Sequence, residues 1–185
     1  MELFYIKKKK IWYNWYKIEH RKEAIMKKTI ILAVAFFMLL LSVAPSTFAA
    51  GDRLTTRETF NIAVSPLVSS NLAYALYFTP SGDIQLRNVR SHKILWNTNT
   101  KNLNIFQFRI DQYSGKLTLT DVNKTPYWTS DNKAWATAWY GQGNEPANLK
   151  GDLLIVQEDG NLVLYNTVNL DRGWYPVWAS NTTGQ

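Results

Sequence analysis

The most informative stretch of this chain is Gln157-Glu158-Asp159-Gly160-Asn161-Leu162-Val163-Leu164-Tyr165. Its odd-numbered positions put two amides, a carboxylate, a phenol and one small apolar side chain on a period of two, which places them on one face of a strand. The Asp159-Gly160 pair is a strong hairpin signal, so we expect the chain to fold back there, with Gln157 and Asp159 on one arm. Asn161, Val163 and Tyr165 then lie on the other arm. Polar groups that converge around an apolar patch indicate a pocket for a ligand rich in hydroxyl groups.

This pattern resembles the sugar-site signature of the monocot mannose-binding (bulb-type) lectin family, and all five specified positions match. The resemblance implies that Asp159 and Asn161 bind the axial 2-hydroxyl of mannose. It also implies that Gln157 binds the 3-hydroxyl, that Tyr165 binds the 4-hydroxyl and that Val163 packs against the ring carbons. Asp only accepts hydrogen bonds, whereas the amides and the phenol donate and accept, which suits a neutral sugar. The alternative is the polar face of an ordinary hairpin.

A turn followed by an alternating strand occurs three times. The segments are Gly82-Asp83-Ile84-Gln85-Leu86, Gly115-Lys116-Leu117-Thr118-Leu119 and Gly160-Asn161-Leu162-Val163-Leu164. A tryptophan phrase follows each of them: Trp96-Asn97-Thr98-Asn99-Thr100, Trp128-Thr129-Ser130-Asp131 and Trp178-Ala179-Ser180-Asn181-Thr182. Internal repetition of this kind predicts three similar sheet units around a shared core.

For these repeats the resemblance implies an all-β fold, the β-prism of type II, with three four-stranded antiparallel sheets about a pseudo-threefold axis. It covers Gly51 to Gln185, where the sequence shows short strands and no convincing helical period. Trp96, Trp128 and Trp178 are then expected to point inward, each burying about 150–250 Å². The alternative is that these tryptophans form a platform for a ligand.

The signature itself is intact only once. The first copy has Thr79, Ser81, Asp83, Gln85 and Arg87 at the five positions, and the second has Gln112, Ser114, Lys116, Thr118 and Thr120. Both copies lack the carboxylate at the second position, which is the acceptor that a mannose site requires. We therefore expect one functional site, at Gln157–Tyr165, and two structural or altered copies.

An insertion precedes the intact copy. The spacing from the tryptophan phrase to the next signature grows from 16 residues (Trp96 to Gln112) to 29 (Trp128 to Gln157). The excess lies in residues 133–150, a region that contains Trp135 and Trp139 and that we expect to be a loop. It either extends the sugar site with stacking aromatics or covers an exposed edge of the core.

The N-terminal part has the features of a targeting segment. Lys27-Lys28 precede an apolar run from Ile30 to Ala44, and small residues follow up to Ala50, as in a secretory signal peptide. We expect a signal peptide over residues 26–49, a lectin domain over 50–185 and a secreted or extracellular location, including association with the cell surface. Residues 1–25 are expected to be a misannotated leader or an extended basic region. A retained membrane anchor is the competing interpretation.

Composition excludes several function classes. The net charge of +7 belongs mainly to residues 1–49, and the rest of the chain holds 12 basic and 11 acidic residues, so we expect no nucleic acid partner and no membrane binding after cleavage. The chain has no cysteine, and His92 is the one histidine after residue 49, so neither a catalytic triad nor a metal cluster can be assembled. We therefore expect no cofactor, no metal and no enzymatic activity.

The expected partners are mannose-containing glycans. Members of the resembled family commonly dimerise by exchanging C-terminal strands, and the segment from Trp178 to Gln185 is placed for a homodimer of that kind. The alternative function is a lectin-like bacteriocin or another protein-directed binding module on the same β-prism scaffold. Bacteriocins of this kind usually have tandem domains, whereas this sequence shows one.

Overall fold

The computed structural model describes residues 19, 21, 51–64, 66–169 and 172–185. The expected leader (1–25) and signal peptide (26–49) therefore lie outside the described residues, apart from residues 19 and 21. Within the described parts of the chain, no helix is long and apolar enough to cross a membrane.

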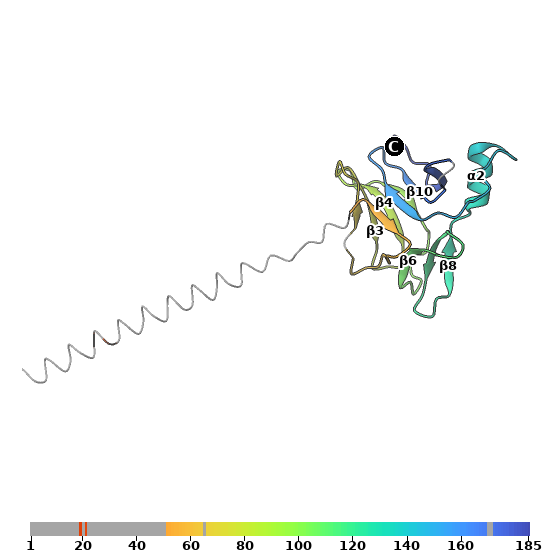
Figure 1. The fold of residues 1–185 in the computed structure, drawn as a ribbon. Coiled ribbons are helices and arrows are strands. Elements are labelled where there is room, and N and C mark those ends of the chain that lie inside the picture. The colour runs from red at the N-terminus through yellow and green to blue at the C-terminus, as the bar shows by residue number, and fades with distance from the viewer. Residues whose placement is uncertain (1–18, 20, 22–50, 65, 170–171) are drawn as a thin grey trace, which may run out of the picture. The chain divides into compact units, whose positions relative to one another are not determined.

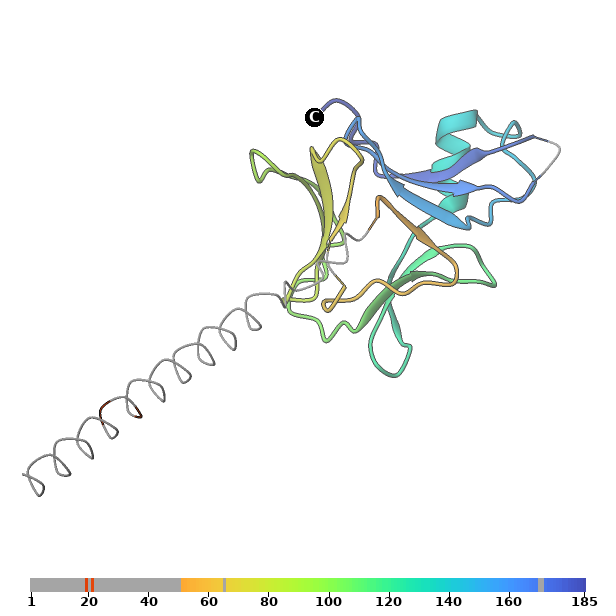
Figure 2. The same ribbon diagram turned by 60° about the vertical axis from the view of Figure 1, so that its left-hand side comes forward.

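From residue 51 onward the described chain forms three antiparallel sheets (Figures 1 and 2). The first sheet has the order β1 (Arg53–Thr55), β9 (Leu153–Val156), β10 (Leu162–Asn166) and β11 (Tyr175–Ala179). The second has the order β2 (Leu67–Val68), β3 (Tyr74–Phe78), β4 (Ile84–Asn88) and β5 (Ile94–Asn97). The third has the order β6 (Gln107–Ile110), β7 (Leu117–Thr120) and β8 (Pro126–Thr129). The all-β prediction with three antiparallel sheets is confirmed.

The prediction of four strands in every sheet is wrong for the third sheet. Next to β6 the described chain makes only one bridge, between Phe60 and Phe108, whose backbone groups exchange two hydrogen bonds of 2.8 Å. The chain then turns away, because the Asn61 side-chain oxygen accepts from the backbone N–H groups of Ala63 and Val64. Asn commonly forms such a turn, and here it ends the fourth strand after one residue.

The three repeats are equivalent in the structure. In each hairpin a leucine lies opposite the repeat's tryptophan, and the register shifts immediately after that leucine. The pairs are Leu86 with Trp96, Leu119 with Trp128 and Leu164 with Trp178. Each register shift is a β-bulge, which bends its strand. The same bulge in all three hairpins is therefore part of the repeated unit.

The three tryptophans converge, as the core interpretation predicts. The ring centroids of Trp96 lie 5.5 Å from those of both Trp128 and Trp178, and the last two are 5.9 Å apart. All three pairs meet edge to face, which is a favoured geometry for aromatic rings. The rings pack against the buried leucines and isoleucines of all three sheets, so they join the sheets at a common centre.

The rest of each tryptophan phrase ties the hairpin turn to the strand end. Two residues after each tryptophan, a hydroxyl accepts from the N–H of the residue that follows the turn. The pairs are Thr98 with Ile84, Ser130 with Leu117 and Ser180 with Leu162. Two residues further on, a side chain donates to the carbonyl of the turn glycine. The pairs are Thr100 with Gly82, Asn132 with Gly115 and Thr182 with Gly160. The recurrence of the phrase is thus explained by the fold.

The insertion contains a helix, so the expectation of a loop without helical structure is wrong. Helix α2 (Asn132–Tyr140) begins at Asp131, whose carboxylate accepts from the N–H of Ala134, and ends where Gly141 donates to the carbonyl of Thr137. Nine residues are marginal for an isolated helix. Tertiary contacts stabilise it: Trp135 packs against the core, and the Tyr140 hydroxyl donates to the carbonyl of Pro176.

Candidate functional site

The intact signature forms the turn between β9 and β10, as predicted. The N–H of Gln157 donates to the carbonyl of Asn161 at 2.8 Å, and the N–H of Gly160 donates back to Gln157 at 3.2 Å. Gly160 has a φ of +85°, and a Cβ there would lie 2.7 Å from the ring of Tyr74. Only glycine satisfies both the left-handed backbone and the close approach of this ring.

The strand that leaves the turn presents two different faces. Leu162 and Leu164 are fully buried in the core, whereas Asn161 and Tyr165 are partly exposed on the opposite face. Val163 lies on that outer face too, but only 4% of its surface is exposed. The structure thus brings the polar residues of the signature together, and it leaves Val163 little free surface.

Gln157 and Tyr165 form one end of the site. The Gln157 amide nitrogen donates to the phenol oxygen of Tyr165 at 2.6 Å. Burial raises the pKa of the Tyr165 phenol and the nearby Asp159 carboxylate adds to this rise, although the hydrogen bond from Gln157 opposes it. The phenol therefore keeps its proton near neutral pH. Because Gln157 fills an acceptor position, the Tyr165 O–H remains able to donate to a ligand.

Asp159 lies exposed at the tip of the turn. One carboxylate oxygen accepts from the backbone N–H of Asn161 at 3.0 Å, and the other accepts from the Thr183 hydroxyl at 3.2 Å. A carboxylate has about four acceptor positions, so two remain for a ligand. The backbone and Thr183 thus orient the carboxylate without saturating it.

Asn161 has a role in the fold as well as in the site. Its side-chain oxygen accepts from the Ser180 hydroxyl at 2.9 Å and from the N–H of Thr182 at 3.2 Å. In the first copy Asp83 accepts equivalent bonds from Thr98 and Thr100. The Asn161 side-chain nitrogen donates to none of the described residues, so it is a hydrogen-bond donor that remains available for a ligand.

The C-terminal residues are part of the site, and the sequence analysis did not assign them to it. Besides the bonds from Ser180, Thr182 and Thr183, the N–H of Gly184 donates to the carbonyl of Asp159 at 2.9 Å. The recurring tryptophan phrase was the signal that could have revealed this clamp. We name residues 180–184 the C-terminal clamp.

The first degenerate copy uses its polar groups internally. The Gln85 amide donates to Asp83 at 2.8 Å, and Arg87 donates in turn to the Gln85 oxygen. The Arg87 guanidinium also lies over the ring of Tyr77, 5.3 Å from its centroid. A ladder of side chains therefore occupies the face that is open in the intact copy.

In the second degenerate copy, the turn is one residue longer than the alignment of the three repeats assumes. The N–H of Asp111 donates to the carbonyl of Lys116, which is the bond that Gln157 makes to Asn161 in the intact copy. Asp111 thus takes the first signature position, and the assignment of Gln112 to that position is wrong. The cause is a turn with one extra residue, which a gap-free alignment on Gly115 cannot show.

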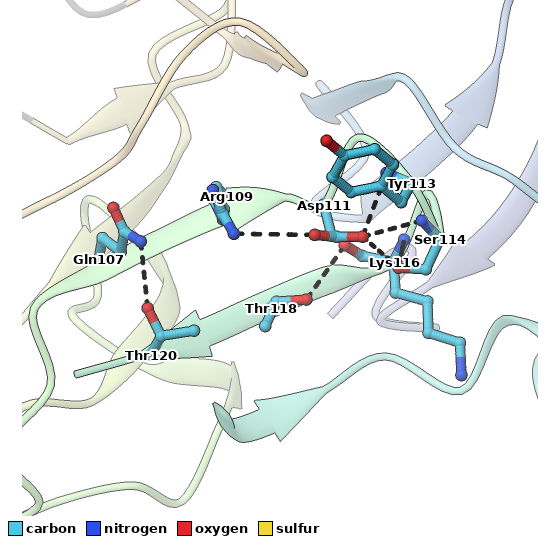
Figure 3. A network of polar contacts seen from close by, with 8 residues as sticks. All are labelled: Gln107, Arg109, Asp111, Tyr113, Ser114, Lys116, Thr118 and Thr120. Atoms are coloured by element: carbon cyan, nitrogen blue, oxygen red, sulfur yellow. Dashed lines mark hydrogen bonds and ion pairs between the residues drawn. The ribbon is translucent and has the colours of Figure 1, made fainter. Parts of the chain in front are cut away.

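Figure 3 shows that the second copy is also bonded internally. One Asp111 oxygen accepts from the N–H groups of Tyr113 and Ser114 and from the Ser114 hydroxyl, and the other lies 3.7 Å from Arg109. Lys116 extends its side chain away from this cluster (Figure 3). No carboxylate and amide pair comparable to Asp159 and Asn161 is formed in this copy.

Among the solved structures that resemble this chain are two lectins. A lectin of Marasmius oreades is 24% identical and aligns over 72% of this chain and 93% of its own length, with a TM-score of 0.53. A monomeric monocot mannose-binding lectin from Gastrodia elata is 21% identical and aligns over 71% and 98%, with a TM-score of 0.50. The chain has a β-prism II fold. No protein-family model matches the sequence, and no curated protein does either.

In this β-prism, helix α2 lies along β11 at the edge of the first sheet (Figures 1 and 2). The Trp135 indole donates to the Asn181 side-chain oxygen at 3.0 Å near the start of the helix, and Tyr140 bonds to Pro176 at its end. Between the helix and the signature lies a cavity of about 540 Å³, lined by Trp135, Ala138, Trp139, Asn161, Asn181 and Thr183. Of the two alternatives for the insertion, the packing of Trp135 bears out the cover over the core. The cavity shares Asn161 with the signature.

No group of three or more His, Cys, Asp or Glu residues within the described part of the β-prism could hold a metal ion. The adjacent carboxylates of Glu158 and Asp159 have different surroundings. Asp159 is oriented by the clamp and the turn, whereas the backbone carbonyl of Glu158 accepts from the Asn71 amide and its side chain is exposed. Of these two carboxylates, Asp159 is the one that is oriented by hydrogen bonds of the signature and the clamp.

Glu145 connects the loop after α2 back to the helix, and this contact predicts a pH dependence. Its carboxylate accepts from Lys133 and from the Thr137 hydroxyl, and these bonds lower its pKa from 4.5 to about 2, with Lys133 as the main cause. Because the folded-state pKa is depressed, the carboxylate's stabilising contribution is present above pH 4.5 and is lost as the pH falls through about 2.

We expect Glu145→Gln to lower the thermal midpoint at pH 6, and the difference from wild type to shrink between pH 4.5 and about 2. Thermal unfolding followed across this pH range measures the effect. Glu158→Gln is the control, because that side chain is exposed and should change the midpoint little at any pH. A difference that stays constant with pH would show that the Glu145 charge is not involved.

Proposed function

We propose that the domain is a secreted lectin that binds mannose or mannose-containing glycans through the one intact site at residues 157–165. The observation that carries this proposal is the contrast between the copies. Asp159, Asn161 and Tyr165 keep acceptors and donors available on the outer face, whereas the polar groups of the other two copies bond to one another.

The proposed complex follows the chemistry of each side chain. Asp159 accepts from the 2-hydroxyl of mannose, and the Asn161 nitrogen donates to the same oxygen. The Tyr165 O–H donates to the 4-hydroxyl and Gln157 bonds to the 3-hydroxyl, so each hydroxyl gains a partner of complementary type. Val163 lies beneath the ring carbons. In the proposed complex the sugar ring lies between Asp159 and Tyr165.

Binding at one such site is expected to be weak. A few hydrogen bonds of about 0.5–1.5 kcal/mol each, less the cost of association, give about −4 kcal/mol and a millimolar dissociation constant. Avidity requires several sites in one assembly. We therefore also propose a homodimer formed by exchange of residues 178–185, in which the clamp bonds are made to the partner chain. A monomeric mass in light scattering would contradict the exchange.

The proposed location rests on the sequence. Residues 26–49 act as a signal peptide, and the exported protein begins near residue 50. Amino-terminal sequencing of the protein recovered from the culture medium or the cell surface tests this. An uncleaved chain in the membrane fraction would instead support a retained anchor.

A protein-directed binder, such as a lectin-like bacteriocin, is the second candidate function. It shares the β-prism and makes a different prediction in a competition experiment. Free mannose should displace a lectin from its target, whereas a protein-directed binder should remain bound. A binder that also hydrolysed mannosides would contradict the proposal that the domain has no enzymatic activity.

Asp159→Ala is expected to abolish binding of methyl α-mannoside, because it removes the acceptor for the 2-hydroxyl and the anchor for Thr183. Isothermal titration calorimetry on residues 50–185 measures binding, and thermal unfolding checks that the fold remains. Glu158→Ala is the matched control, since it removes the neighbouring exposed carboxylate and should leave the dissociation constant unchanged. Equal affinity of Asp159→Ala and wild type would refute the proposed site.

A further inference from the structure

The cavity beside α2 adjoins the proposed mannose site. Asn161 is a member of the signature and also lines the cavity, and Thr183 lines it while donating to the Asp159 carboxylate. A ligand held by Asp159 and Asn161 would therefore lie next to this open cavity, because Asn161 belongs to both. Its volume of about 540 Å³ falls within the range of about 300–1,000 Å³ that small-molecule sites occupy.

The cavity walls have the chemistry that a neutral sugar requires. Two indoles and the Ala138 methyl supply apolar surface for C–H faces, and Asn161, Asn181 and Thr183 supply amide and hydroxyl groups. None of the residues that line the cavity carries a charge. An anionic or cationic partner would find no counter-ion in this lining, whereas a hydroxyl-rich ring finds both an apolar face and hydrogen-bond partners.

The aromatic wall is held in place before any ligand arrives. Trp135 packs against the core and bonds to Asn181, and the ring of Trp139 stacks on it at 5.4 Å and 14°. Trp139 itself is 63% exposed and so presents apolar ring surface at the cavity. A wall that is already ordered loses little side-chain entropy on binding, which favours affinity.

We propose that this cavity, the α2 subsite, binds a second sugar residue of the same neutral glycan whose first mannose occupies the signature site. The proposal rests on the function proposed above. It predicts that the protein prefers α-linked mannose oligosaccharides to the monosaccharide, and that the preference depends on the exposed face of Trp139.

Calorimetry with methyl α-mannoside and with α-linked mannobiose and mannotriose tests the α2 subsite. The wild-type protein should bind the oligosaccharides at least about tenfold more tightly, which corresponds to about 1.4 kcal/mol. Trp139→Ala should remove most of this gain and leave monosaccharide binding unchanged. Ala138→Tyr, which fills the cavity while keeping both indoles, should have the same effect. Trp135 is unsuitable for this test, because its packing against the core couples it to folding.

Tyr113→Ala is the control for loss of an exposed aromatic side chain away from the cavity. It should change neither the affinity for the monosaccharide nor the affinity for the oligosaccharides. Equal affinity of the wild-type protein for monosaccharide and oligosaccharides would overturn the α2 subsite while leaving the proposed function intact. An oligosaccharide preference that survives both Trp139→Ala and Ala138→Tyr would overturn it as well. Failure of the wild-type protein to bind any mannoside would overturn both the function and the subsite.

Discussion

Trp178→Ala is expected to destabilise the domain by about 3–5 kcal/mol, the range for removal of a large buried aromatic side chain. The ring centroid of Trp178 lies 5.5 Å from that of Trp96 and 5.9 Å from that of Trp128, and 7% of the Trp178 surface is exposed. The substitution removes one of the three rings that join the sheets, and Trp96 and Trp128 each lose one of their two edge-to-face partners in the cluster. Because small domains are stable by only about 5–15 kcal/mol, such a loss approaches the whole free energy of unfolding.

Urea unfolding of residues 50–185, followed by tryptophan fluorescence and by circular dichroism, measures this change. Trp174→Ala is the matched control, because Trp174 is 60% exposed and lies four residues before Trp178 in the sequence. The control should change the free energy of unfolding by less than about 0.5 kcal/mol. Similar losses in the two variants would show that the central tryptophan cluster does not dominate the stability of the fold.

The repeats made the architecture predictable from the sequence. A Trp at a fixed place after each turn and alternating strand specified three equivalent hairpins, and the structure pairs Leu86, Leu119 and Leu164 with those tryptophans. The period of two also separated Leu162 and Leu164 from Asn161 and Tyr165 correctly. These features depend on local pattern, which a sequence displays directly.

Features that depend on tertiary contacts were not predictable in the same way. Helix α2 has only Asn132 and Ala136 fully buried, so its sequence carries too little apolar period to reveal it. The loss of the fourth strand in the third sheet depends on the turn at Asn61, and the extra residue in the second copy depends on hydrogen-bond register. Neither leaves a signal in hydrophobic periodicity.

The sequence predicted which residues make up the candidate site, but it did not predict the hydrogen bonds that hold them in place. The sequence specified which side chains converge at the turn between Gln157 and Asn161. It did not indicate that Asn161 is bonded to Ser180 and Thr182, since these residues lie about twenty positions further along the chain. The resemblance assigns Asn161 to the ligand alone, whereas the structure also gives it a part in the fold. The hydrogen bonds from the C-terminal clamp therefore have to be tested separately from the side chains that would contact the ligand.

Deletion of residues 181–185 is expected to abolish mannoside binding, with a loss of at least about a hundredfold in affinity, or about 2.7 kcal/mol. The deletion removes the Thr182 bonds to Asn161 and Gly160 and the bonds from Thr183 and Gly184 to Asp159. The Asp159 carboxylate then keeps only the bond from the Asn161 N–H, and the Asn161 side chain keeps only the bond from Ser180, among the bonds of the site described above. Strand β11 remains. The four hydrogen bonds to the turn contribute about 0.5–1.5 kcal/mol each, and the deletion also removes the Asn181 acceptor of the Trp135 indole. We expect the buried core to remain folded without them.

Calorimetry with methyl α-mannoside and thermal unfolding separate these two effects. Deletion of Gln185 alone is the control, because this exposed residue bonds to just the Thr182 carbonyl among the described residues. It should leave both affinity and midpoint unchanged. Thr182→Val should reproduce part of the loss, since it keeps the size of the buried side chain and removes the bond to Gly160. A folded deletion variant with wild-type affinity would show that the turn orders its own polar groups. The C-terminal clamp would then be a feature of the fold and not of the site.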